Sequence, residues 1–155
     1  MKLNRDLREF IEWLNSHEVE YLVVGGHAVA FHGYPRYTGD IDFLLRCNDQ
    51  NAAKVVEALK SFGFPNSEQF RKVLSEPDKI VQLGRPPNRI DLLTSASGLE
   101  FEDVWAASVE GELDGLPVRF PDLSSLLRNK KASGRPKDLA DADELEKRCR
   151  PTHTE

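Results

Sequence analysis

The sequence predicts an α/β (α+β) fold, with a mixed, mostly antiparallel sheet flanked by helices and a helical C-terminus. Three observations lead to this fold class. Short apolar, β-branched runs alternate with stretches in which apolar residues recur every three or four positions. A glycine pair, Gly25-Gly26, separates the first such run from a short helical segment. Residues 79–83 and 89–94 are two apolar runs joined by five turn-forming residues, which is typical of a hairpin.

The first part of the chain alternates between helical and extended patterns. Apolar residues at three- and four-residue spacings predict amphipathic helices over 3–16 and 51–62. Shorter apolar runs predict strands at 21–24 and 37–45. Between these strands, 27–32 follows the glycine pair and is predicted to be a short helix.

The second part begins with residues 65–77, whose pattern is too weak to assign an element. Beyond the hairpin, a helix is predicted at 100–107. Residues 115–120 are predicted to form an edge strand, because Pro117 lacks the N–H that a central strand donates. The last part is helical in two runs on either side of Gly134, namely 122–133 and 138–149.

Length and composition indicate one ordinary globular domain, placed at 1–150 and followed by a tail at 151–155. The net charge of −5 argues against a protein that coats nucleic acid nonspecifically. The charged N-terminus does not resemble a signal peptide, and no apolar run approaches about 18 residues, so we expect a cytoplasmic protein without membrane contact. Cys47 and Cys149 have no CxxC partner, which favours reduced thiols and no zinc site.

Three aspartates are candidate ligands for a metal ion. Asp40 and Asp42 are two residues apart in a predicted strand, so both side chains project from one face. If the strand that carries Asp91 lies beside theirs, the third carboxylate joins them. Such a cluster needs a cation, and oxygen ligands suit Mg²⁺ or Mn²⁺. The alternative is that each aspartate caps a strand or lies on a solvated surface.

The order of these motifs resembles a known superfamily. Gly25-Gly26, thirteen intervening residues, Asp40-Ile41-Asp42 and a later Arg89-Ile90-Asp91 resemble the polymerase-beta-type nucleotidyltransferases. Lys130 followed by 134–141, with its Lys-Asp-x-x-Asp motif, is similar to a helical motif of small bacterial members related to AbiE-type toxins.

The resemblance implies a nucleotidyltransferase fold that binds two Mg²⁺ ions and an NTP. It implies that the three aspartates hold the metal and that the glycine turn holds the triphosphate, with Lys130 as the first choice for a basic residue near the nucleotide. One departure is that the family often has serine after the first glycine, where this chain has Gly26. The catalytic candidates are Asp40, Asp42, Asp91 and Lys130, and the nucleotide-binding candidates are Gly25, Gly26, His27, Lys130 and Lys137.

The expected activity is metal-dependent transfer of a nucleoside monophosphate from an NTP to an acceptor hydroxyl. The toxin-like motif points to tRNA or another macromolecule, such as a protein, as acceptor, and to an antitoxin as partner. Two alternatives stay open, a noncatalytic nucleotide- or partner-binding module and an antibiotic nucleotidyltransferase. The sequence leaves the base preference and the oligomeric state undetermined.

Simpler roles remain open for the supporting residues. Asp138 and Asp141 are three residues apart on a predicted helix, which favours a cap or an ion pair with Arg135 over a metal site. Arg89 is placed to pair with a site carboxylate. Tyr37 is either a contact for nucleotide or acceptor, or a packing aromatic.

Overall fold

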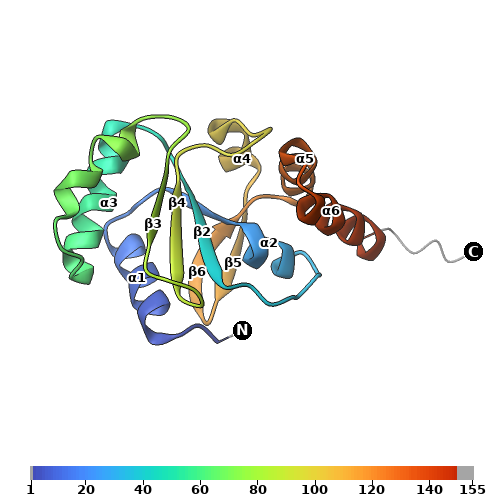
Figure 1. The fold of residues 1–155 in the computed structure, drawn as a ribbon, viewed down its shortest axis with the longest axis horizontal. Coiled ribbons are helices and arrows are strands. Elements are labelled where there is room, and N and C mark those ends of the chain that lie inside the picture. The colour runs from blue at the N-terminus through green and yellow to red at the C-terminus, as the bar shows by residue number, and fades with distance from the viewer. Residues whose placement is uncertain (1, 150–155) are drawn as a thin grey trace, which may run out of the picture.

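A four-stranded sheet lies at the centre of the computed structural model, which describes residues 2–149 (Figure 1). Its strands are β1 (Tyr21–Val24), β2 (Asp40–Leu45), β4 (Arg89–Leu93) and β3 (Ile80–Leu83), in that spatial order. The central pair β2–β4 is parallel, whereas the two outer pairs are antiparallel. The predicted mixed, mostly antiparallel sheet and the predicted hairpin are therefore confirmed.

Helices surround this sheet and extend the molecule at one end. Figure 1 shows α3 at one end of the molecule and the last two helices, α5 and α6, at the other. The predicted helical C-terminus is confirmed. The helices are α1 (Arg5–Ser16), α2 (Gly25–Phe31), α3 (Asp49–Phe62), α4 (Phe101–Ala107), α5 (Leu123–Ser133) and α6 (Pro136–Arg148).

Side-chain caps explain where the two long N-terminal helices begin. The Asn4 side chain accepts a hydrogen bond from the backbone N–H of Leu7 at 3.0 Å. The Asn48 side chain accepts one from the N–H of Asn51 at 2.7 Å. Each bond satisfies a donor that the helix itself leaves unpaired. Gly63 adopts a left-handed conformation with φ of 95° and ends α3, as expected for glycine just beyond a helix.

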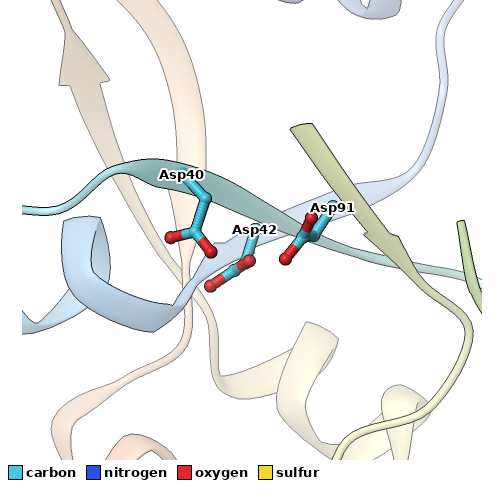
Figure 2. Close-up of side chains that lie close together, drawn as sticks. All are labelled: Asp40, Asp42 and Asp91. Carbon is cyan, nitrogen blue, oxygen red and sulfur yellow. The ribbon is translucent and has the colours of Figure 1, made fainter. Parts of the chain in front are cut away.

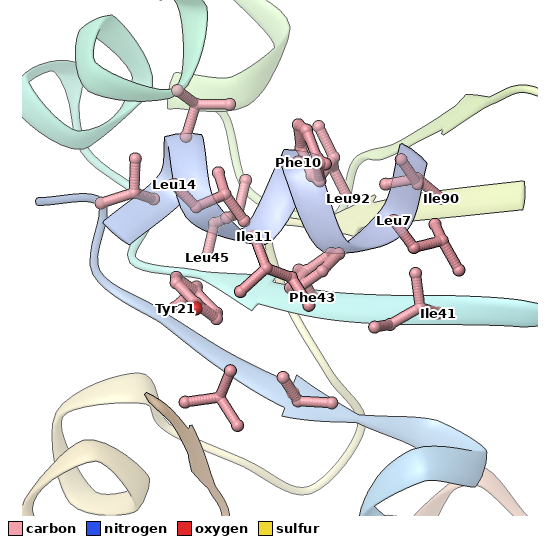
Figure 3. Close-up of a cluster of buried hydrophobic side chains, with 14 of the residues drawn as sticks. Leu7, Phe10, Ile11, Leu14, Tyr21, Ile41, Phe43, Leu45, Ile90 and Leu92 are labelled. Carbon is pink, nitrogen blue, oxygen red and sulfur yellow. The ribbon is translucent and has the colours of Figure 1, made fainter. Parts of the chain in front are cut away.

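The main core lies between α1, α3 and one face of the sheet (Figure 3). Phe10 on α1 packs edge-to-face on Phe43 of β2, with ring centroids 5.6 Å apart. Ile41 of β2 is fully buried in this same cluster. Because side chains alternate along a strand, Asp40 and Asp42 point to the opposite face. The core thus places the two carboxylates away from α1.

The structure adds elements that the sequence patterns did not reveal. Residues 65–77 contain two short 3₁₀ turns, Ser67–Phe70 and Val73–Ser75. The expected edge strand is present as β6 (Leu116–Phe120), but it pairs antiparallel with an unexpected strand, β5 (Val109–Leu113). The β5 segment, Val-Glu-Gly-Glu-Leu, has too few apolar residues to show a strand pattern.

Some predicted boundaries also shift. The extended run expected from residue 37 begins as a strand only at Asp40, and α2 begins at Gly25 itself. The predicted tail, 151–155, lies outside the described residues. Within residues 2–149, no helix is both long enough and apolar enough to cross a membrane.

Candidate metal centre

The sheet brings the three predicted aspartates together (Figure 2). Asp40 and Asp42 project from the same face of β2, and the parallel register places Asp91 of β4 directly opposite Asp42. One carboxylate oxygen from each residue lies within 4.8 Å of the others. Asp91 is buried, and the other two are half-buried. This arrangement forms a cluster of oxygen ligands that could hold a divalent cation.

Arg89 partly neutralises the cluster. Its Nη2 donates to Asp40 Oδ2 at 2.6 Å, and its Nε donates to Asp91 Oδ1 at 2.9 Å. The predicted pairing of Arg89 with a site carboxylate is therefore confirmed. When all these groups are ionised, three negative charges and one positive charge leave a net charge of −2. One divalent cation matches that charge.

The negative form of Asp42 is disfavoured by burial and by the neighbouring carboxylates. Burial, together with the charges of Asp40 and Asp91, raises the pKa of the Asp42 carboxyl to about 7. The ammonium group of Lys130 acts in the opposite direction. Without a cation, the Asp42 carboxyl therefore retains its proton to a pH far above the usual range for aspartic acid.

The glycine turn packs directly against these carboxylates. Gly25 has φ of +68°, and a Cβ atom at this position would lie 2.0 Å from Asp42 Oδ2. At Gly26, a Cβ atom would lie 2.9 Å from the Cβ of Thr38. A side chain therefore does not fit at either position without displacing its neighbour. The space that a serine at position 26 would need is filled by Thr38.

Gly25→Ala is expected to destabilise the fold and to weaken its response to divalent cations, because the added methyl group must push the Asp42 carboxylate aside. Gly33→Ala is the matched control, since Gly33 also has a positive φ, of +117°, but a Cβ atom there would meet none of the described residues within 4 Å. The control should lose about 1 kcal/mol from backbone strain alone. Denaturant unfolding with and without Mn²⁺ measures both effects. Equal losses of unfolding free energy in the two variants would contradict the close packing of Gly25 against Asp42.

His27 lies beside the cluster but has no protein partner for one ring nitrogen. The side chain is only 6% exposed, and its buried Nδ1 makes no hydrogen bond within the described residues. Burial lowers the pKa of the imidazole, and the charge of Asp40 opposes this effect. His27 also lines a cavity of about 250 Å³ together with Arg36, Tyr37 and Asp40. Tyr37 is largely exposed, so the packing role considered for it does not apply.

Lys130 is buried in a group of ion pairs rather than exposed at a helix surface. Its Nζ lies 3.1 Å from Asp138 Oδ1 and 3.3 Å from Asp141 Oδ2. Burial by itself would raise the pKa of Asp138, but hydrogen bonds from Ser133, Arg135 and Lys130 lower it to about 2. The predicted ion pair between Asp138 and Arg135 is confirmed at 2.7 Å.

The other basic candidate, Lys137, is exposed in the first turn of α6. The sequence did not reveal that Arg36 pairs with Asp141 across 105 positions of the chain. Local patterns carry no signal for such a contact. No protein-family model and no curated protein matches the sequence. Interpretation of the site therefore depends on its geometry, and the resemblance to nucleotidyltransferases remains a prediction.

Proposed function

We propose that the protein is a divalent-metal-dependent nucleotidyltransferase, which transfers a nucleoside monophosphate from an NTP to an acceptor hydroxyl and releases pyrophosphate. The observation that carries this proposal is the convergence of Asp40, Asp42 and Asp91, with one oxygen of each within 4.8 Å of the others. Carboxylate oxygens are the ligands that Mg²⁺ and Mn²⁺ prefer, so the donor set fits these ions. The order of the glycine turn, the paired aspartates and the third aspartate supports nucleotidyl transfer over other metal chemistry.

When bound, a pair of such ions would supply the positive charge that in-line displacement at the α-phosphate requires. Asp40 and Asp42 would hold both ions. Asp91 would contribute to holding the catalytic ion and would help to deprotonate the acceptor hydroxyl. These roles follow the resemblance, and the shared location of the three side chains supports them.

The nucleotide would lie against the glycine turn. Gly25 contacts the Asp42 carboxylate closely, so a triphosphate held there by the backbone of Gly25 and Gly26 would be adjacent to the metal. His27 is proposed as a polar neighbour of the phosphates. Lys130 is proposed to offset triphosphate charge, and its influence on the pKa of Asp42 supports this placement. Lys137 would contact the nucleotide from its exposed position in the first turn of α6.

The proposed acceptor is a macromolecule, tRNA or a protein, and the enzyme is proposed to be a cytoplasmic toxin controlled by an antitoxin. Support comes from the similarity of residues 130–141 to the toxin motif. One observation favours the noncatalytic alternative, because Arg89 already pairs with two of the three candidate ligands, Asp40 and Asp91. A nucleotide- or partner-binding module would retain these ion pairs permanently.

The test is incubation with Mg²⁺ and each α-labelled NTP in the presence of total RNA, cell extract or a panel of antibiotics. Label transfer to one acceptor class supports the enzyme and identifies its substrate. Binding of NTP without transfer to any of the three acceptor classes would favour the noncatalytic module. A chelator control shows whether transfer requires the cation.

Asp91→Asn is expected to leave the fold intact but remove most of the thermal stabilisation by Mg²⁺ or Mn²⁺. The amide preserves the shape of the side chain and removes the charge that binds the ion. Asp143→Asn is the matched control, since Asp143 is an exposed carboxylate on α6. Melting temperatures with increasing metal concentration measure the effect. An unchanged metal response in Asp91→Asn would show that Asp91 is not a ligand.

A further inference from the structure

The C-terminal helices are joined to the metal-site strand by buried charges. Arg36 lies in the segment between α2 and β2, four residues before Asp40. Its Nε donates to Asp141 Oδ1 at 3.1 Å, and its Nη2 donates to Asp141 Oδ2 at 2.7 Å. A guanidinium group bound through two nitrogens has a fixed orientation as well as a favourable charge interaction. The segment that enters β2 is thus attached to α6 at a defined angle.

Asp141 is shared between two cations. The oxygen that accepts from Arg36 Nη2 also lies 3.3 Å from the ammonium of Lys130 on α5. Lys130 has a second carboxylate partner in Asp138, at 3.1 Å. A shift of the Asp141 carboxylate would therefore move the ammonium toward Asp138. Arg36 and Lys130 are thus linked through one carboxylate oxygen.

The carboxylates of Asp138 and Asp141 and the ammonium of Lys130 are buried, which restricts the positions that each can adopt. Asp138 and Asp141 are each 3% exposed, and Lys130 is 6% exposed. Buried charges are costly unless they are paired, so each group has few alternative positions.

Other contacts attach the C-terminal helices to the rest of the fold. Arg128 Nε donates to the carbonyl of Gly98 at 3.1 Å, and the Asn129 side chain donates to the carbonyl of Ser97 at 2.9 Å. Leu126 is also fully buried in the main core. Arg36 is therefore not the sole link that holds these helices in place, which leaves its orientation of Asp141 as a distinct role.

We propose that Arg36 is a positioning residue, which orients the Asp141 carboxylate and thereby fixes the location of the Lys130 ammonium. This proposal rests on the proposed nucleotidyltransferase function for its catalytic consequence. Its structural part, the control of Lys130 by Arg36, is independent of that function.

The structural part is tested by the reactivity of Lys130 toward an amine-acetylating reagent, followed by peptide mass spectrometry. In Arg36→Gln, Lys130 should be acetylated at least about fivefold faster than in the native protein, because Asp141 loses its fixed orientation. Arg36→Lys should restore part of the protection. Arg71→Gln is the matched control, because Arg71 forms an exposed ion pair with Glu68 that includes no residue of this network. Equal rates for Lys130 in all four proteins would overturn the proposal.

The catalytic consequence is tested by steady-state kinetics of label transfer. In Arg36→Gln, kcat should fall by about tenfold to a hundredfold, as expected for a displaced charged group, while thermal stabilisation by Mg²⁺ alone stays unchanged. Native activity in Arg36→Gln, or an equal loss of the Mg²⁺ response, would overturn the proposal. If the native protein transfers no label, the proposed function fails, and the acetylation of Lys130 still decides the positioning role.

Discussion

Asp42→Asn is expected to make the metal-free protein more stable at about pH 8 and, at the same time, to abolish its response to Mg²⁺ and its transfer activity. The two effects have one cause. Asp42 is a partly buried carboxylate beside Asp40 and Asp91, and it is therefore unfavourable when ionised without a cation. Asparagine occupies the same space without the charge, but it is a much weaker ligand for a divalent ion.

The sign of the pH dependence follows from proton binding. The pKa of Asp42 is about 7 in the folded protein, against an ordinary value of 3.8. Between these values the folded protein holds a proton that the unfolded chain has lost, so stability from this group decreases as the pH rises. A displacement of this size corresponds to at most about 4 kcal/mol. Most of that decrease should be absent in Asp42→Asn.

Thermal melting from about pH 4 to about pH 8, in a metal chelator, measures this prediction. The native protein should lose stability across the interval, relative to Asp42→Asn, and Mg²⁺ should restore it at the upper end. Asp143→Asn, an exposed replacement of the same kind, should follow the native curve. Parallel curves for the native protein and Asp42→Asn would contradict the burial of an uncompensated carboxylate.

The same variant should reduce label transfer by about 10³-fold or more. This corresponds to about 4 kcal/mol of transition-state stabilisation, a magnitude expected when a metal-held charge is lost. A folded Asp42→Asn protein that still transfers label at the native rate would exclude Asp42 from the metal site.

Lys130→Met is expected to destabilise the protein by about 3–5 kcal/mol, the largest effect on stability that we predict. Removing the ammonium leaves Asp138 and Asp141 buried with an excess of negative charge, although Arg135 and Arg36 remain paired with them. Methionine has a similar length, so little packing is lost. Denaturant unfolding gives the difference in free energy of unfolding.

Lys131→Met is the matched control for this prediction. Lys131 is the next residue on α5, and its ammonium pairs with Glu146 at a half-exposed site. Exposed ion pairs contribute at most about 1 kcal/mol, so this variant should remain close to the native stability. Adding Asp138→Asn to Lys130→Met should recover part of the loss, because it removes one of the two carboxylates. If Lys130→Met lost no more free energy of unfolding than the control, the buried carboxylates of Asp138 and Asp141 would not need the Lys130 charge.

Local signals account for most of the fold that the sequence predicted. The Asn48 cap and Gly63 stop of α3 act within a few residues, and so does the alternation that separates Ile41 from Asp40 and Asp42. Such features depend on backbone conformation and nearest neighbours. Strand β5 escaped prediction because its stability comes from pairing with β6, and its own pattern is weak.

The candidate site required more than local information. The sequence placed Asp40 and Asp42 on one face, but only the parallel pairing of β2 with β4 placed Asp91 opposite Asp42. Parallel strands are joined by long connections, so their register depends on packing of the whole domain. The same reason explains why Arg89 could be assigned to the cluster only in general terms.

By itself, the sequence determined the succession of helices and strands apart from β5 and the two 3₁₀ turns, the shared face of Asp40 and Asp42, and the presence of a glycine turn. The tertiary structure alone decided that Gly25 must lack a side chain beside Asp42, and that Arg36 and Lys130 share Asp141. The physical reason is the range of the interactions involved. Helix caps, turns and side-chain alternation act between near neighbours, whereas strand pairing, burial and charge pairing join residues that only the completed fold brings together.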